Sequence, residues 1–247
     1  MTTAPHLDSI YINVPDLKAV LDVLRARLGL NPMLQFELVE HEHVVPIALI
    51  PSGSHTLEVL GRVAGERPAA GINQRVEIDL PIAEVTRLEL VASSELIAHP
   101  ASKPDLRAIK VRTPQAEADR ARLAQLLGEG QPQHAEVSRS ERLHFESCPT
   151  DRLSSSSLPG LAFAGWHRLG FKVPSLSPTF RALAAQGWQT AAAPFRVLPG
   201  LSEAMFYLPS KLLIQISEEH VGMMLPVLAG HWARSKLRRK PIQFHIH

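Results

Sequence analysis

Two stretches decide the fold: INVPDLKAVLDVLRARLGL (residues 12–30) and FKVPSLSPTFRALAAQGWQ (residues 171–189). Each begins at the end of an alternating apolar segment, passes through Val-Pro, one residue and a leucine, and continues as an apolar pattern that closes near a glycine. Alternation with a period of two predicts a strand. Apolar residues at three- and four-residue steps predict an amphipathic helix. A repeat of this kind predicts a protein built from copies of one structural unit.

Residues typical of helix starts and ends support a helix in both copies. In the first, Asp16 is a good N-cap and Gly29 is well placed to end the helix. In the second, Ser177 is the expected N-cap, Pro178 the first helical residue and Gly187 the end. The two helices are therefore expected at corresponding places in the repeat.

Three strand-like segments follow each helix, separated by turn residues. After the first helix they are QFELVEHE, VVPIALIPS and HTLEVLG, and after the second they are PFRVLPG, EAMFYLP and KLLIQISEE. Pro-Ser-Gly-Ser and Pro-Gly pairs between them are typical of turns. The sequence thus predicts a strand–helix–three-strand unit over residues 6–62 and again over residues 166–219.

Weaker copies lie between these two units. Residues 108–130 give strand, proline, helix and glycine, and residues 71–93 have strand character without a long helix. Residues 1–104 are expected to hold one clear unit and one degenerate unit. Residues 105–247 are expected to hold two units, a C-terminal helix started or interrupted by Pro226, and a basic tail.

The composition predicts a globular protein, with 45% hydrophobic and 20% charged residues and a net charge of +2. The basic run KLRRK near the C-terminus is more typical of a solvated helix end than of a nucleic-acid site, so no nucleic-acid partner is expected. The single cysteine excludes an intramolecular disulfide. No secretory signal and no apolar run of about 18 residues is present, so a cytoplasmic protein without a membrane span is expected.

The repeated unit, opening with V-P-D-L, resembles the vicinal oxygen chelate superfamily, which includes glyoxalase I, methylmalonyl-CoA epimerase, extradiol dioxygenases and bleomycin-resistance proteins. The stretch VPIALIPSGSHTLEVLG looks like the third and fourth strands of such a module. The resemblance implies an α+β fold of tandem βαβββ modules that form paired half-barrels around a cup. It also implies that metal ligands, where present, lie on the first and fourth strands of paired modules.

Aligning these positions on the chain gives an unusual set. The first-strand positions are Ser9, Gln74, Ala108 and Arg168, and the fourth-strand positions are Glu58, Glu146 and Gln215. The two histidines that the resemblance leads one to expect are missing, and iron and similar metals favour imidazole. A divalent metal is therefore not supported by the usual ligands, and the cofactor stays open.

Three residues remain weak candidates for metal ligation: Glu58, His167 and Gln215. His167 is included because a one-residue slip of register would turn it, rather than Arg168, toward the cup. The sequence does not decide between the two registers.

A cup without the usual ligands predicts a different chemistry. Arg168 could supply the positive charge by pairing with a carboxylate or enolate oxygen through two parallel hydrogen bonds. Glu58 could be a general base if burial raises its pKa. Ser9, Gln74 and Gln215 are then the expected substrate-binding residues. The structural alternative is that Arg168 and Glu58 form an ion pair or face solvent.

The favoured function is an enzyme of the isomerase, lyase or dioxygenase type acting on a small oxygenated metabolite, with a degenerate or absent metal site. One alternative is a small-molecule binding protein without catalysis, similar to the bleomycin-resistance proteins. Another is a scaffold protein whose cup is filled. The substrate, the reaction and a homodimeric state are left open by the sequence.

Overall fold

The computed structural model describes residues 4–14, 16–28, 30–40, 43–52, 55–61, 76–78, 85–90, 96–100, 108–113, 115–128, 142–147, 165–238 and 242–246. The first unit consists of β1 (His6–Asn13), α1 (Leu17–Leu28), β2 (Leu34–Glu40), β3 (His43–Ser52) and β4 (His55–Leu60). The last unit consists of β10 (Gly165–Lys172), α3 (Leu176–Ala185), β11 (Gln189–Leu198), β12 (Leu201–Tyr207) and β13 (Leu213–Glu219). Both copies of the predicted strand–helix–three-strand order are therefore confirmed.

The two units join through their first strands. The described strands form a nine-stranded sheet in the order β11-β12-β13-β10-β1-β4-β3-β2-β14. β1 runs antiparallel to β10, while each of these strands is parallel to the fourth strand of its own unit, β4 or β13. The order of strands is thus the same on both sides of the β1–β10 pair. The mixed α+β architecture of βαβββ modules is as predicted.

A second sheet comes from the middle of the chain. Its strands are β5 (Val76–Ile78), β6 (Val85–Leu90), β7 (Leu96–Pro100), β8 (Ala108–Thr113) and β9 (Arg142–Ser147), in the order β7-β6-β5-β8-β9. β5 is antiparallel to β8, and β8 is parallel to β9, which repeats the pattern of the β1–β10 junction. The predicted boundary after residue 104 lies outside the described residues.

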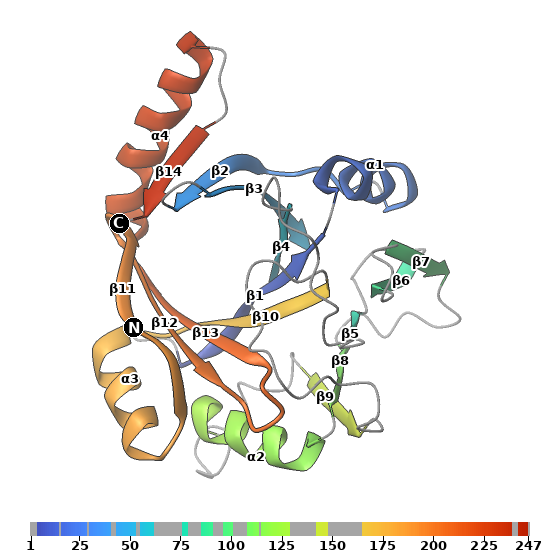
Figure 1. Ribbon diagram of the computed structural model, residues 1–247, viewed down its shortest axis with the longest axis vertical. Helices are drawn as coiled ribbons and strands as arrows, with labels where there is room; N and C mark the ends of the chain where they lie inside the picture. The colour runs from blue at the N-terminus through green and yellow to red at the C-terminus, as the bar shows by residue number, and fades with distance from the viewer. Residues whose placement is uncertain are drawn as a thin grey trace.

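Helices cover one face of the nine-stranded sheet, which we call the outer face. The side chains of Ile12, Leu57, Phe171 and Ile214 on this face belong to one buried hydrophobic cluster, together with residues of α1, α2 (Ala116–Leu127) and α3. Figure 1 shows α1 and α3 on the outside of the curved sheet. Residues that alternate with these along the strands therefore point to the opposite, inner face.

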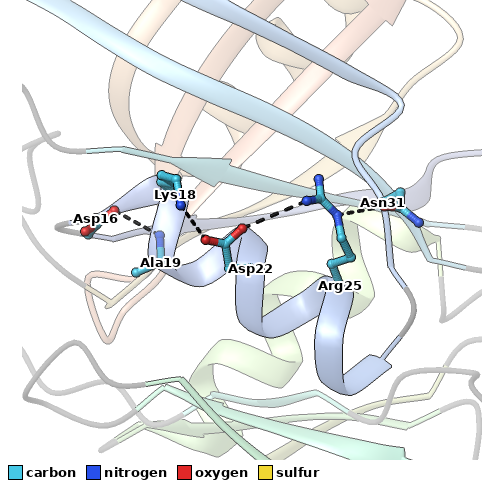
Figure 2. Close-up of polar contacts among 6 residues, drawn as sticks. All are labelled: Asp16, Lys18, Ala19, Asp22, Arg25 and Asn31. Atoms are coloured by element: carbon cyan, nitrogen blue, oxygen red, sulfur yellow. Dashed lines mark hydrogen bonds and ion pairs between the residues drawn. The ribbon is translucent and has the colours of Figure 1, made fainter.

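Side-chain contacts fix the start of α1, as Figure 2 shows. The carboxylate of Asp16 accepts a hydrogen bond from the backbone N–H of Ala19 at 2.9 Å, so Asp16 is the predicted N-cap. Further along the helix, Lys18 donates to Asp22 at 2.6 Å, an exposed pair four residues apart. Such a pair adds a few tenths of a kcal/mol to helix stability.

The start of α3 differs from the prediction. The helix begins at Leu176 and its N-cap is Ser175, so the prediction of Ser177 as the cap is wrong. The Glu218 carboxylate on β13 accepts a hydrogen bond from the Leu176 backbone N–H at 2.7 Å and satisfies the first turn in place of a serine cap. Pro178 is tolerated inside this turn because the first N–H groups of a helix have no intrahelical acceptor. Gly187, with φ of 77°, follows the helix as predicted.

The C-terminal helix is present as α4 (Val221–Arg238), with Pro226 in its first half. After it, in the region expected to be a basic tail, the chain forms a strand, β14 (Ile242–Ile246), which pairs in parallel with β2. The sheet edge at β2 supplies the hydrogen bonds that order this segment. Among the described residues, no helix combines the length and the hydropathy required to cross a bilayer.

The outer-face core predicts the effect of removing one of its aromatic residues. Phe171 on β10 is 0% exposed, so Phe171→Ala should lower the free energy of unfolding by about 3 to 5 kcal/mol through lost burial and a residual cavity. Urea unfolding measures the change. Met33→Ala is the matched control, because Met33 is 67% exposed and its loss should change stability by less than about 0.5 kcal/mol. Equal effects of the two substitutions would contradict the assignment of the core.

Candidate active site

Five polar residues from both units meet on the inner face of the sheet. They alternate along their strands with members of the outer-face cluster such as Ile10, Leu57 and Ile214. We call them the inner cluster: Tyr11, Glu58, Arg168, Glu203 and Gln215. The register places Tyr11 of β1 directly between Glu58 of β4 and Arg168 of β10. The junction of the two units therefore brings together side chains that are far apart in the sequence.

Tyr11 contacts residues of the last unit through both its hydroxyl and its ring. The Gln215 Nε2 donates a hydrogen bond to the Tyr11 hydroxyl at 2.7 Å. The Arg168 Cζ lies 4.0 Å from the centroid of the Tyr11 ring, which is a cation–π contact. Tyr11 and Gln215 are only 4% and 1% exposed, so both contacts are shielded from bulk water. The Oε1 of Gln215 is buried and has no hydrogen-bond partner among the described residues.

Burial changes the acidity of Glu58. Desolvation, the largest influence, and repulsion from Glu203 raise the pKa of Glu58 to about 7, although attraction to Arg168 and hydrogen bonding to the Tyr11 hydroxyl oppose this rise. A carboxylate in water titrates near 4.3. Near neutral pH, Glu58 therefore exists in both protonation states, as a group that accepts and returns protons requires.

A second buried carboxyl lies on β12. Burial, the largest influence, and repulsion from Glu219 raise the pKa of Glu203 to about 7 against the attraction of Arg168. Both carboxyls thus share one neighbouring guanidinium, and one negative charge near it disfavours a second. Repulsion from an ionised Glu203 raises the pKa of Glu58, which favours a state in which one carboxyl is ionised while the other holds a proton.

Some of the site residues predicted from the sequence belong to the inner cluster, and others do not. Glu58, Arg168 and Gln215 meet in the inner cluster, and the stacking on Tyr11 shows that Arg168 is turned to the inner face. Ser9 lies one pleat from Tyr11 and is buried, and its hydroxyl donates to the carboxylate of Asp8 at 2.8 Å. Gln74 and the side chain of His167 lie outside the part of the chain that the structure describes.

Sequence reasoning missed Tyr11 and Glu203. Tyr11 could have been found, because it is two residues after Ser9 on the same face of the same strand. Glu203 carried a weaker signal: in EAMFYLP it alternates with Ala204, which is in the outer-face core. A carboxyl opposite a core position faces either water or a cup, and only the fold decides between these.

The residue set does not fit a divalent metal of the kind bound by related folds. Arg168 occupies one of the aligned ligand positions, and its permanent positive charge would repel a cation. Ser9, at another of these positions, donates its hydroxyl to Asp8. Among the described residues, no three of the histidines, cysteines, aspartates and glutamates are grouped so that they could hold a metal ion. The cation of the inner cluster is the guanidinium itself.

The inner cluster can therefore combine three functions. Arg168 can bind and stabilise an anionic oxygen, and its side chain is only partly buried. Glu58 and Glu203 can each accept or donate a proton near neutral pH. Gln215 presents a buried carbonyl oxygen that can accept a hydrogen bond. Together these groups suit the transfer of a proton to or from carbon next to a polarised carbonyl.

The raised pKa values predict how stability depends on pH. Since folding raises both from 4.5 to about 7, the stabilisation is complete below pH 4.5 and is lost as the pH rises through 7. Each carboxyl should contribute about 2 to 3 kcal/mol to this loss. Urea unfolding at pH 5 and pH 8 should show a smaller difference for Glu58→Gln than for wild type. Glu117→Gln, on the exposed surface of α2, is the control and should keep the wild-type difference. An unchanged pH dependence in Glu58→Gln would contradict a buried, proton-binding Glu58.

The fold of this chain is similar to that of proteins of known structure. No protein-family model matches the sequence, and no curated protein matches it. Among solved structures, glyoxalase I from Zea mays has a TM-score of 0.59 at 10% identity, over 87% of this chain and 92% of that chain. A mutant of the same enzyme has a TM-score of 0.57 at 9% identity, over 87% of this chain and 94% of that chain.

A methylmalonyl-CoA epimerase from Mycobacterium tuberculosis also matches, with a TM-score of 0.40 at 13% identity, over 89% of each chain. This likeness is too distant to carry an argument. The similarity to glyoxalase I is one of fold, since the identities are low. The architecture expected from the V-P-D-L repeat is therefore confirmed: the chain has a βαβββ fold similar to that of glyoxalase I.

Proposed function

We propose that this protein is an enzyme of the isomerase type, which moves a proton at a carbon atom next to a carbonyl group of a small oxygenated metabolite. The observation that carries the proposal is the arrangement of two carboxyls, Glu58 and Glu203, beside one shared guanidinium on the inner face, where desolvation raises both pKa values to about 7. A proton on such a carbon leaves only if the resulting negative charge on oxygen is stabilised. The inner cluster contains both a base and a fixed cation for this purpose.

In the proposed reaction the ionised Glu58 removes the proton from carbon. The C–H bond breaks, an O–H bond forms on Glu58, and the electron pair passes through the new C–C double bond to the carbonyl oxygen. Arg168 donates hydrogen bonds to this enolate oxygen, a role for which its charge and its planar donors are suited. The guanidinium thus carries out the charge stabilisation that a Lewis-acidic metal supplies in other enzymes.

Glu203 is proposed to return a proton from its own carboxyl group. Its O–H bond breaks, the enolate carbon gains a hydrogen, and the carbonyl is restored. Because Glu58 and Glu203 reach the inner face from strands of different units, β4 and β12, they approach Arg168 from different elements. Delivery to the opposite side of the carbon would invert its configuration, and return from the same side would give exchange without inversion.

Binding of the substrate is assigned to the remaining polar groups. Gln215 can accept a hydrogen bond through Oε1, and an unsatisfied buried acceptor costs about 1 to 3 kcal/mol unless a partner is supplied. Ser9 and Gln74 stay predicted substrate-binding residues. The cytoplasmic location and the homodimer also stay predictions.

The test is proton exchange in D2O. Small aldehydes, ketones and thioesters with one C–H next to the carbonyl are incubated with the protein, and loss of that proton signal is followed by NMR. Wild type should exchange at least one compound, and Glu58→Gln should slow this exchange by about 100-fold or more while binding persists, because a general base contributes this much. Glu117→Gln is the matched control and should exchange at the wild-type rate.

Two results would contradict the proposal. Exchange that is as fast in Glu58→Gln as in wild type would remove Glu58 from the reaction. Binding of a compound with an exchangeable proton, without any exchange in wild type, would favour the alternative of ligand capture without catalysis.

A further inference from the structure

The aromatic ring of Tyr11 touches both ends of a short segment of β10. A Cβ atom added at Gly170 would lie 2.8 Å from Cε2 of the Tyr11 ring, which is closer than real Cβ atoms approach. Two residues earlier on the same face, Arg168 places its Cζ 4.0 Å from the ring centroid. The absence of a side chain at residue 170 therefore makes room for the ring, and the ring lies where it meets the guanidinium.

The hydroxyl of Tyr11 connects two other strands. It accepts a hydrogen bond from Nε2 of Gln215 on β13 at 2.7 Å. Its direct register partner on β4 is Glu58, and hydrogen bonding by the hydroxyl lowers the pKa of that carboxyl. Since burial raises the pKa of the phenol well above its ordinary value, the hydroxyl keeps its proton and can donate it to the ionised Glu58.

Tyr11 thus bridges the two units: its own strand and Glu58 belong to the first, while Arg168 and Gln215 belong to the last. A cation over an aromatic ring is attracted by the ring face, more so where water is excluded. A partly buried guanidinium held in this way loses rotational freedom before a ligand arrives, which lowers the cost of binding an anionic oxygen.

We infer that Tyr11 is a positioning residue that acts through two groups: its ring holds the Arg168 guanidinium in place, and its hydroxyl orients Glu58. The roles of Arg168 and Glu58 in this inference rest on the proposed function. The contacts that Tyr11 makes with their side chains do not depend on it. Tyr11 itself exchanges no proton with the substrate. Its two parts act separately, so they can be removed separately.

The surroundings of Glu58 determine what removal of the hydroxyl should do. The charged groups that influence it are Arg168 on β10, Glu203 on β12 and Asp8 on β1, and none of these is altered by Tyr11→Phe. Two interactions of the hydroxyl are lost: the hydrogen bond that it accepts from Gln215, and the one that stabilises the ionised carboxylate of Glu58. Gln215 is uncharged, so only the second acts directly on the pKa of Glu58. The pKa of Glu58 should therefore rise by about 0.5 to 1 unit, the equivalent of one ordinary hydrogen bond.

The ring is tested by a second variant. Tyr11→Leu removes the aromatic face as well as the hydroxyl, whereas Tyr11→Phe keeps the face. The Arg168 side-chain N–H groups should exchange with water at a nearly wild-type rate in Tyr11→Phe and at least about tenfold faster in Tyr11→Leu, because only the latter releases the guanidinium. Tyr207→Phe is the matched control, since Tyr207 is a half-buried tyrosine on the same face of the sheet.

The experiment is NMR of the full chain without ligand. Carbon-13 shifts of the glutamate carboxyls against pH give the pKa of Glu58, assigned with Glu58→Gln, and nitrogen-15 spectra give the exchange of Arg168, assigned with Arg168→Lys. The expected result is a raised Glu58 pKa in Tyr11→Phe, released Arg168 only in Tyr11→Leu, and neither change in Tyr207→Phe. If Tyr11→Leu does not fold, Gly170→Ala replaces it, because the added methyl group must displace the ring.

A purely structural Tyr11 would give another pattern. The variants would then lose stability while the Glu58 pKa and the Arg168 exchange stayed at their wild-type values, and this result would overturn the inference. Neither readout needs a substrate. If Glu58→Gln fails to slow proton exchange at carbon, the proposed function is refuted and the positioning role of Tyr11 is not. If the Glu58 pKa and the Arg168 exchange do not change in the Tyr11 variants, the positioning role is refuted and the proposed function is not.

Discussion

The antiparallel pairing of β1 with β10 is the constraint on which the rest of the structure depends. It joins the first and the last strand–helix–three-strand units into one sheet and sets a fixed register, with Tyr11 opposite Arg168. A slip by one residue would turn every side chain of one strand to the other face. The outer-face core prevents this slip, because Ile10 and Leu169 would have to leave it. Packing on one face of the sheet thus determines which polar groups meet on the other.

The energetic character of the inner cluster follows from placing three ionisable groups where water is scarce. A single buried charge is costly, and a shared guanidinium compensates only part of the cost for two carboxyls. The outcome is that Glu58 and Glu203 both bind protons more tightly than exposed glutamates do. As a result, the free energy of unfolding falls as the pH rises. Groups placed for function rather than for packing commonly lower the stability of a protein in this way.

The sequence predicts the architecture well because the architecture depends on hydrophobic periodicity and on the residues that end helices and form turns. The strands and helices of both outer units lie where alternation, three- and four-residue steps and turn residues put them. The predicted helix start at Ser177 is wrong because the cap is a long-range contact from Glu218, which no local pattern can reveal. The same limit applies to β14, whose pairing with β2 requires knowledge of the sheet edge.

In the inner cluster, too, some features could be predicted from local sequence patterns and others depended on long-range contacts. Glu58, Arg168 and Gln215 could be named from the sequence because they fall at corresponding positions of a repeated unit. Their mutual approach, and the inward facing of Arg168, depended on register across two strands and could not be predicted. For Glu203, the alternation on its own strand left open whether it faces water or the inner cluster, and its pKa is raised by burial and by Glu219 on another strand, neither of which a local pattern reveals.

A double-mutant cycle between Glu58 and Arg168 tests the central claim most directly, because the two residues belong to different units and interact only if β1 and β10 join them. Urea unfolding of wild type, Glu58→Gln, Arg168→Met and the double variant gives the coupling. The account predicts a favourable coupling of about 1 to 3 kcal/mol at pH 8, where Glu58 is ionised, and a smaller one at pH 5. Stabilities that add within about 0.3 kcal/mol at both pH values would contradict it.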